Sequence, residues 1–202
     1  MKIICIGRNY VKHIKELGNE KPENPIIFLK PDSALIKNND PFYYPDFSTD
    51  IHYEVEILIK IKRVGKSIPV NFAHMYYDEI GLGIDLTARD LQSMAKAKGL
   101  PWDLAKGFNG SAPISNFIFK NNFNVQDVNF SLKLNGSLVQ ASNTSHMLWS
   151  IDEIIAYVSK YMTLKKGDIL FTGTPEGVGP IKIGDQLEGF IESKNMFNFE
   201  VR

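Results

Sequence analysis

The feature that most limits the fold is a series of short apolar segments, in which hydrophobic residues recur with the two-residue period of β-strands. Gly-Asp, Asn-Gly and Pro turns separate these segments, and few helical stretches interrupt them. The pattern therefore predicts a β-rich α+β fold rather than a doubly wound parallel sheet. The predicted strands cover residues 2–6, 26–30, 53–61, 80–86, 129–135, 169–172, 185–191 and 197–201.

Helical periodicity predicts three helices. One covers residues 10–17, and a second follows Asp85 and ends at Gly99. The third lies in the stretch SIDEIIAYVSKYM, where Ser150 and Glu153 have the spacing of a capping box. With 202 residues and 44% hydrophobic content, the chain is expected to fold as a single domain, 1–202.

Composition excludes several partners. Lys and Arg number 23, as do Asp and Glu, so no net field attracts nucleic acid or an anionic membrane, and neither partner is expected. The sequence shows no signal peptide and no apolar run long enough for a membrane span, which favours a cytoplasmic location. The lone Cys5 lies in an apolar segment and is expected to be a buried structural thiol.

Two carboxylates interrupt an otherwise apolar strand, DIHYEVEILIKI. Because side chains alternate along a strand, Glu54 and Glu56 should point to the same side, close enough to converge on one ion. A solvated strand face with two scattered charges is the alternative. A third carboxylate, Asp85, ends a hydrophobic segment and is expected to lead directly into a helix, either as its N-cap or as part of the same site. Three carboxylates near strand ends would form an all-oxygen site suited to Mg²⁺ or Mn²⁺.

Two further segments have a functional and a structural interpretation. Lys106 precedes Gly107 and a loop of small residues; it is either surface charge, or a group that neutralises developing negative charge or carries a proton if burial lowers its pKa. The stretch TGTPEGVGP lacks the ending of a phosphate loop. It either builds a tight turn or presents hydroxyl and N–H groups to a substrate carboxylate.

Seven motifs follow one another in a fixed order over nearly the whole chain: GRNY, HIKE, FLKP, HYEVEI, GIDLTARDLQ, AKGFNGSAP and GDILFTGTPEGVG. This ordered set resembles the fumarylacetoacetate hydrolase superfamily, and more closely its acylpyruvase and oxaloacetate decarboxylase branch. The resemblance implies a single mixed β-roll domain with a few short helices, a Mg²⁺ or Mn²⁺ ion, a homodimer, and small 2-oxo or 1,3-dicarbonyl acids as substrates.

The resemblance also assigns roles to individual positions. It implies that the metal ligands are Glu54, Glu56 and Asp85, and that the catalytic residues are Lys106 with His13 and Glu16 of a lid segment. It implies substrate contacts from Arg8, Lys30, Arg89, Gln92 and Thr174.

Residue spacing supports part of this assignment. His13 and Glu16 are three residues apart, which places both on one helix face, where the carboxylate can orient the imidazole as a base for water. Such pairs are also common on exposed helices. Arg89 and Gln92 repeat the spacing and could direct donors toward an anion.

The expected activity is metal-dependent hydrolysis of a carbon–carbon bond in acylpyruvates, giving pyruvate and an acid, with oxaloacetate decarboxylation possible at the same site. The alternatives are oxaloacetate tautomerase, 2-hydroxyhepta-2,4-diene-1,7-dioate isomerase and, outside catalysis, an inactive metal-binding scaffold. The His13–Glu16 pair favours hydrolysis, because an isomerase has no water to activate.

Overall fold

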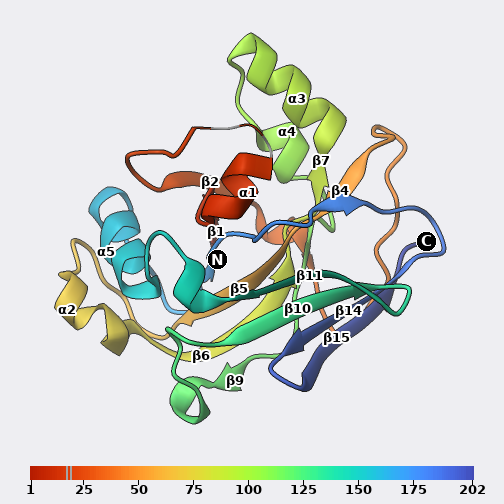
Figure 1. The fold of residues 1–202 in the computed structure, drawn as a ribbon. Helices are drawn as coiled ribbons and strands as arrows, with labels where there is room; N and C mark the ends of the chain where they lie inside the picture. Colours follow the sequence, from red (N-terminus) through yellow and green to blue (C-terminus); the bar gives the residue numbers. More distant parts are fainter. Residues whose placement is uncertain (17, 19) are drawn as a thin grey trace.

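A central mixed sheet forms the middle of the molecule (Figure 1). The computed structural model describes residues 1–16, 18 and 20–202, with the backbone alone at residue 122. The first two strands of the chain pair antiparallel, the first pairs parallel with the late strand at 169–171, and the remaining neighbours are antiparallel. In spatial order the sheet consists of β2 (Ile26–Lys30), β1 (Ile3–Gly7), β12 (Ile169–Phe171), β5 (Val55–Ile61), β6 (Tyr77–Ile84) and β9 (Ile118–Phe119).

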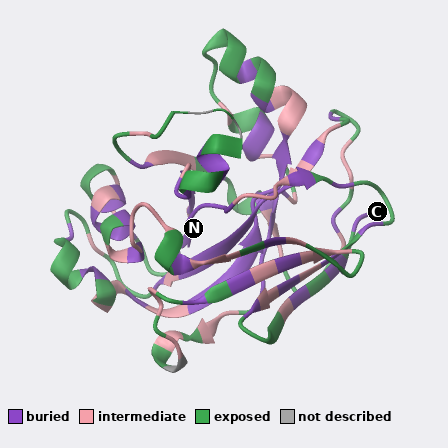
Figure 2. Cartoon of the chain, in the orientation of Figure 1, coloured by how far each residue is buried: buried purple, intermediate pink, exposed green. Residues whose placement is uncertain are grey.

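A second, antiparallel sheet packs on the central one. Its spatial order is β11 (Ser137–Asn143), β10 (Asn129–Leu134), β14 (Gln186–Ile191) and β15 (Lys194–Glu200). The facing sides of the two sheets are apolar and buried, as the purple strands of Figure 2 show. Gly189 allows their close approach, because a Cβ at this position would lie 2.3 Å from the Phe197 ring and 2.7 Å from Leu82.

Short elements complete the fold. Two small sheets pair β13 (Gly179–Pro180), β4 (Ile51–Tyr53) and β7 (Thr87–Ala88), and β3 (Leu35–Ile36) with β8 (Ala112–Pro113). The α-helices are α1 (Val11–Glu16), α2 (Val70–Ala73), α3 (Arg89–Lys98), α4 (Asp103–Lys106) and α5 (Ile151–Tyr161). Single 3₁₀ turns are η1 (Asp32–Ala34), η2 (His74–Tyr76), η3 (Lys120–Asn122) and η4 (Thr144–His146). In the described part of the chain, every helix is too short or too polar to cross a membrane.

The predicted β-rich α+β class is confirmed, and most predicted strands occur within two or three residues of their expected bounds. The capping box of α5 is also confirmed: the Ser150 hydroxyl accepts a hydrogen bond from the Glu153 amide, and the Glu153 carboxylate accepts one from the Ser150 amide. Cys5 is fully buried, as expected. The predicted helix over 10–17 is observed as α1, and its predicted last residue lies outside the described residues.

Two local predictions near the acidic residues were wrong. The strand predicted over 53–61 is interrupted at Glu54, which lies between β4 and β5. Asp85 does not lead directly into a helix, because strand β7 separates it from α3, whose N-cap is Ala88. Both differences arise because this stretch changes partner: β4 and β7 leave the central sheet and pair with each other.

Candidate active site

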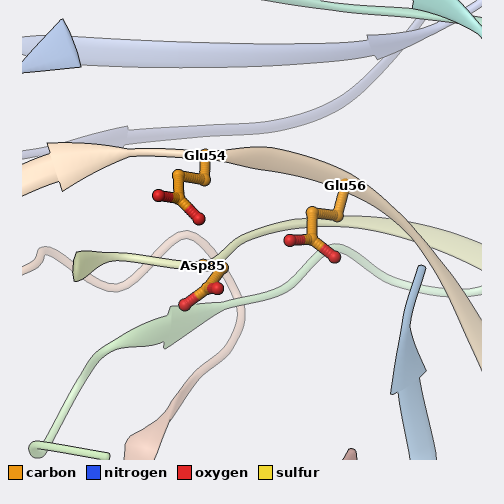
Figure 3. Close-up of side chains that lie close together, drawn as sticks. All are labelled: Glu54, Glu56 and Asp85. Carbon is orange, nitrogen blue, oxygen red and sulfur yellow. The ribbon is translucent and has the colours of Figure 1, made fainter. Parts of the chain in front are cut away.

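Three carboxylates converge where β5 begins and β6 ends. Pairing of these strands places Glu56 opposite Gly83, and just beyond, the Asp85 amide donates to the Glu54 carbonyl at 2.8 Å. One oxygen from each of Glu54, Glu56 and Asp85 lies within 4.8 Å of the others. Figure 3 shows the three side chains turned toward one another. All three are buried, which rules out the solvated strand face considered for the sequence.

The donor set fits a hard divalent cation. Glu56 accepts a hydrogen bond from the Gly173 amide at 2.6 Å, but it forms no ion pair with any described residue. Burial, together with the neighbouring Asp85 and Glu54 carboxylates, raises the pKa of Glu56 well above its ordinary value. A buried carboxylate with this much uncompensated repulsion is stabilised when a cation binds beside it, and an all-oxygen set suits Mg²⁺ or Mn²⁺.

Lys106 provides fixed positive charge next to this cluster. Its Nζ, at the end of α4, lies 2.8 Å from Glu54 Oε2, 2.6 Å from Asp85 Oδ2 and 2.6 Å from Thr87 Oγ1. Burial alone would lower the pKa of Lys106, but Asp85 and Glu54 outweigh it and raise the pKa above its ordinary value. The amine is therefore held in its charged form, which favours charge stabilisation over the proton-carrier alternative.

Arg89 and Lys30 hold the carboxylates from two other sides. Arg89, at the start of α3, forms an ion pair with Glu54 and donates to Gln92 Oε1 at 2.6 Å. Burial would raise the pKa of Glu54, but Lys106, Arg89 and His13 outweigh it and hold the pKa well below its ordinary value. Lys30 Nζ lies 2.8 Å from Asp85 Oδ1 and also contacts the carbonyl of Lys106.

A small cavity with a volume of about 40 Å³ opens over the carboxylates. Four of the five residues predicted to contact substrate line it, namely Arg8, Arg89, Gln92 and Thr174. The predicted catalytic residues His13 and Lys106 line it as well. Lys30 lies behind Asp85 with its side chain fully buried, and Glu16 lies behind His13; neither is part of the cavity wall. The substrate contact of Lys30 stays a prediction, and the structure places its ammonium group against Asp85.

Helix α1 places His13 over the cavity and fastens it there. His13 Nδ1 lies 3.1 Å from Glu16 Oε2, and the other Glu16 oxygen accepts a hydrogen bond from the Gly177 amide at 2.9 Å. The His13 side chain is only 7% exposed, so the predicted pair belongs to the site and not to a solvated helix face. One carboxylate thus orients the imidazole and ties α1 to the glycine-rich loop after β12.

Hydrogen bonds join the glycine-rich loop after β12 to the start of β5, next to Glu54 and Glu56. The Thr174 hydroxyl donates to the Val55 carbonyl at 2.9 Å and accepts from the side-chain nitrogen Nε2 of Gln140 at 3.0 Å. Gln140 also accepts from the Val55 amide at 2.9 Å. The stretch TGTPEGVGP is thus more than a tight turn: it supplies Gly173 to Glu56 and Gly177 to Glu16.

We expect Gly173→Ala to destabilise the fold and weaken the site. Gly173 has φ +102°, and a Cβ there would lie 2.6 Å from the Asn9 Cβ and 3.2 Å from the Ile6 carbonyl. Gly167 has a similar φ of +90° with nothing within 4 Å, so Gly167→Ala is the matched control for backbone strain. In urea unfolding, Gly173→Ala should cost about 1–3 kcal/mol more than Gly167→Ala. Equal losses would show that the close approach to Asn9 is unimportant.

Sequence reasoning missed four residues at the site. Phe28, Lys96 and Trp102 line the cavity, and Thr87 receives the Lys106 ammonium. Lys96 could have been found, because it follows Arg89 by seven residues and therefore shares its face of α3. Phe28 and Thr87 stand in the motifs FLKP and GIDLTARDLQ, and Trp102 lies in a loop on which pocket size was expected to depend, but neither spacing nor periodicity assigned these three side chains to the site.

Known proteins resemble this chain over nearly its whole length. The family described as "Fumarylacetoacetate (FAA) hydrolase C-terminal" matches residues 2–201. The chain belongs to this family. A mouse protein named oxaloacetate tautomerase FAHD1, mitochondrial, is 42% identical over 201 residues, which are 99% of this chain and 91% of the relative. A Dictyostelium discoideum protein named oxaloacetate decarboxylase, mitochondrial, is 43% identical over 189 residues, covering 93% of this chain and 87% of the relative.

A solved structure gives the same family at the level of the fold. The crystal structure of fumarylpyruvate hydrolase from Pseudomonas aeruginosa, in complex with Mn²⁺ and pyruvate, superposes with a TM-score of 0.94 and 32% identity, over 100% of this chain and 89% of that one. Fumarylacetoacetate hydrolase family enzymes thus include proteins named as tautomerases, decarboxylases and hydrolases that resemble this chain over nearly its whole length. The Mn²⁺ of that relative and the acidic cluster of this chain together indicate divalent metal binding.

Proposed function

We propose that the protein is a divalent-metal-dependent hydrolase that cleaves 3-acylpyruvates to pyruvate and a carboxylic acid. The observation that carries this proposal is His13, which lines the cavity that contains the carboxylates and is paired with Glu16 behind it. The proposed ligands are Glu54, Glu56 and Asp85, and the proposed ion is Mg²⁺ or Mn²⁺. When bound, this ion supplies a Lewis acid that stabilises negative charge on the 2-oxo oxygen of the substrate.

His13 is the proposed base. With its Nδ1–H donated to the Glu16 carboxylate, the imidazole leaves Nε2 as a proton acceptor, and the carboxylate stabilises the imidazolium that forms. His13 then takes a proton from water, whose oxygen attacks the distal carbonyl of the acylpyruvate. The bond between this carbonyl and carbon 3 breaks, the carboxylic acid leaves, and carbon 3 takes back the proton that His13 removed from water, which completes pyruvate and restores the neutral imidazole.

The other polar residues of the cavity wall also have proposed roles. Lys106 lies between Glu54 and Asp85 and adds a fixed positive charge beside the oxygen atoms that become negative. Arg8 and Gln92 also line the cavity and are proposed to bind the substrate carboxylate. Arg89 contributes by fixing both Glu54 and Gln92, since its Nη atoms bind these side chains.

Oxaloacetate tautomerisation is the second candidate, favoured by the name of the mouse relative at 42% identity. This reaction needs only proton transfer between carbon 3 and the 2-oxo oxygen, for which His13 is also placed. Decarboxylation, favoured by the name of the Dictyostelium relative, needs no attacking water either. Isomerisation of a diene-dioate has the same requirement for proton transfer alone.

The expected cytoplasmic location and the homodimer stay predictions.

The test is a substrate panel with Mg²⁺ or Mn²⁺, with and without EDTA. We expect release of pyruvate and acetate from acetylpyruvate, and loss of that activity in EDTA. Interconversion of the keto and enol forms of oxaloacetate, with acetylpyruvate left intact, would replace the hydrolase by the tautomerase. Binding of metal and oxalate with no turnover of any substrate would favour the inactive scaffold.

His13→Ala should test the assigned role of His13 as the base. Because His13 is proposed to activate water and lies outside the ligand set, kcat for acetylpyruvate should fall about 10²- to 10⁴-fold, while the Kd for Mn²⁺ should change little. The control is His146→Ala, which removes an exposed imidazole on η4 that is hydrogen-bonded to the Ser142 hydroxyl. A variant that loses Mn²⁺ affinity and activity in parallel would contradict the assigned role.

A further inference from the structure

An apolar groove runs along edge strand β2, next to the site cavity. Ile26, Ile27 and Leu29 of the strand form one wall, and Leu100 and Pro101, which precede α4, form the other. The groove, with a volume of about 400 Å³, is larger than the cavity over the carboxylates. Leu29 and Leu100 are about half exposed, so apolar surface on both walls is left uncovered.

The groove and the cavity share one wall. Phe28, Trp102 and Lys106 line both spaces. The rings of Phe28 and Trp102 meet edge to face, with centroids 6.0 Å apart and an interplanar angle of 62°. Lys106 Nζ lies 5.0 Å from the Phe28 centroid, and Lys96 Nζ lies 5.5 Å from that of Trp102. The groove therefore adjoins the cavity at these three side chains.

Volume and charge indicate what the groove accepts. The cavity over the carboxylates is the smaller of the two spaces, so a longer acyl chain finds more room in the groove. The charged residues of the groove are Asp103 and Lys106, and the Lys106 ammonium is already engaged by Glu54 and Asp85. A second carboxylate on the substrate would thus lie near Asp103 with no lining cation left to pair with it. A neutral alkyl chain would instead bury apolar surface on both walls.

We propose that this groove is the acyl-chain subsite and that the protein prefers 3-acylpyruvates with an unbranched apolar chain longer than acetyl. The inference rests on the proposed function, because it requires the keto-acid end of the substrate to lie against the carboxylates and Lys106. Phe28 and Trp102 then contact the first carbons of the chain, and Leu29 and Leu100 contact its end.

The first test compares acetyl-, butanoyl- and hexanoylpyruvate. Each added methylene should raise kcat/KM about fourfold, since burying one is worth about 0.8 kcal/mol. N-alkyl oxamates of the same chain lengths, titrated with Mn²⁺ present, should show a parallel decrease in Kd, which is a readout independent of turnover. An oxamate whose chain ends in a carboxylate should gain less than the alkyl one.

The second test changes the rim of the groove. Leu100→Asp should lower the hexanoyl-to-acetyl ratio of kcat/KM at least about tenfold, because the end of the chain would meet a charge. The matched control is Leu138→Asp, at a comparably exposed leucine on β11 (61% against 52%), which should leave the ratio unchanged.

The outcomes separate the subsite from the reaction. Cleavage of acetylpyruvate with no dependence on chain length would overturn the subsite and leave the hydrolase in place. No cleavage, with oxamate affinity that rises with chain length and falls in Leu100→Asp, would support the subsite and overturn the hydrolase. A dimer that Leu100→Asp converts to a monomer, with the chain-length dependence unchanged, would identify the groove as a contact between two copies and overturn the proposal.

Discussion

Glu56→Gln should abolish metal binding without destabilising the metal-free protein. We expect the Kd for Mn²⁺ to rise at least about 100-fold and the activity to fall at least about 10³-fold, since an anionic ligand and the Lewis acid are lost together. The melting temperature without metal should stay level or rise. Burial and the Asp85 and Glu54 carboxylates raise the pKa of Glu56, so its ionised form opposes folding, and a neutral amide of the same size removes that cost.

The matched control is Glu79→Gln on the neighbouring strand β6. Glu79 forms an ion pair with Lys60 at 2.8 Å and is partly exposed, so its neutralisation should change neither metal affinity nor activity. Calorimetric titration and thermal unfolding, each with and without EDTA, measure the two effects. Unchanged Mn²⁺ affinity in Glu56→Gln would remove this residue from the ligand set, and a large loss of metal-free stability would contradict the electrostatic argument.

Lys106→Met should have the largest effect on stability. The substitution leaves Glu54 and Asp85 without the ammonium group that lies 2.8 Å and 2.6 Å from them. Removing one partner from a buried ion pair costs about 3–5 kcal/mol, so we expect a loss of this size in the free energy of unfolding. Activity should fall about 10²- to 10³-fold even in the folded variant, because the fixed charge beside the reacting oxygens is gone.

Two comparisons make this prediction specific. Added Mn²⁺ should stabilise Lys106→Met more than the wild type, because a bound cation replaces part of the missing positive charge beside Glu54 and Asp85. Lys133→Met serves as control: Lys133 Nζ lies over the Phe190 ring, and no carboxylate depends on it for an ion pair among the described residues. Wild-type stability in Lys106→Met would show that the ammonium is dispensable for holding the carboxylates.

The pattern of residues predicted the strand-rich class and the convergence of the acidic residues for a physical reason. Alternation along β5 fixes the side to which Glu56 points, and antiparallel pairing with β6 brings Asp85 to it. The interruption at Glu54 was not predictable from alternation, because it depends on β4 pairing with β7 and β13. Strand β11 was also missed, since its sequence, SLVQASN, lacks a regular apolar period.

The cavity wall shows where sequence reasoning stops. The spacing of His13 and Glu16 gave their shared helix face, but the bond from Gly177 that fastens Glu16 joins residues 161 positions apart. Lys30 shows a second limit: its position in the FLKP motif implied a substrate contact, which stays a prediction, while the contacts of its ammonium with Asp85 and backbone carbonyls could not be predicted. Such contacts are set by tertiary packing, which neither spacing nor composition encodes.

The most direct test of the central claim is an anomalous difference map from crystals grown with Mn²⁺. We predict one strong peak between Glu54, Glu56 and Asp85, at a coordination distance of about 2.0–2.3 Å from an oxygen of each. The same crystals of Glu56→Gln should lack it. Wild-type crystals without a peak among these carboxylates, from protein that still cleaves acetylpyruvate in EDTA, would contradict the account.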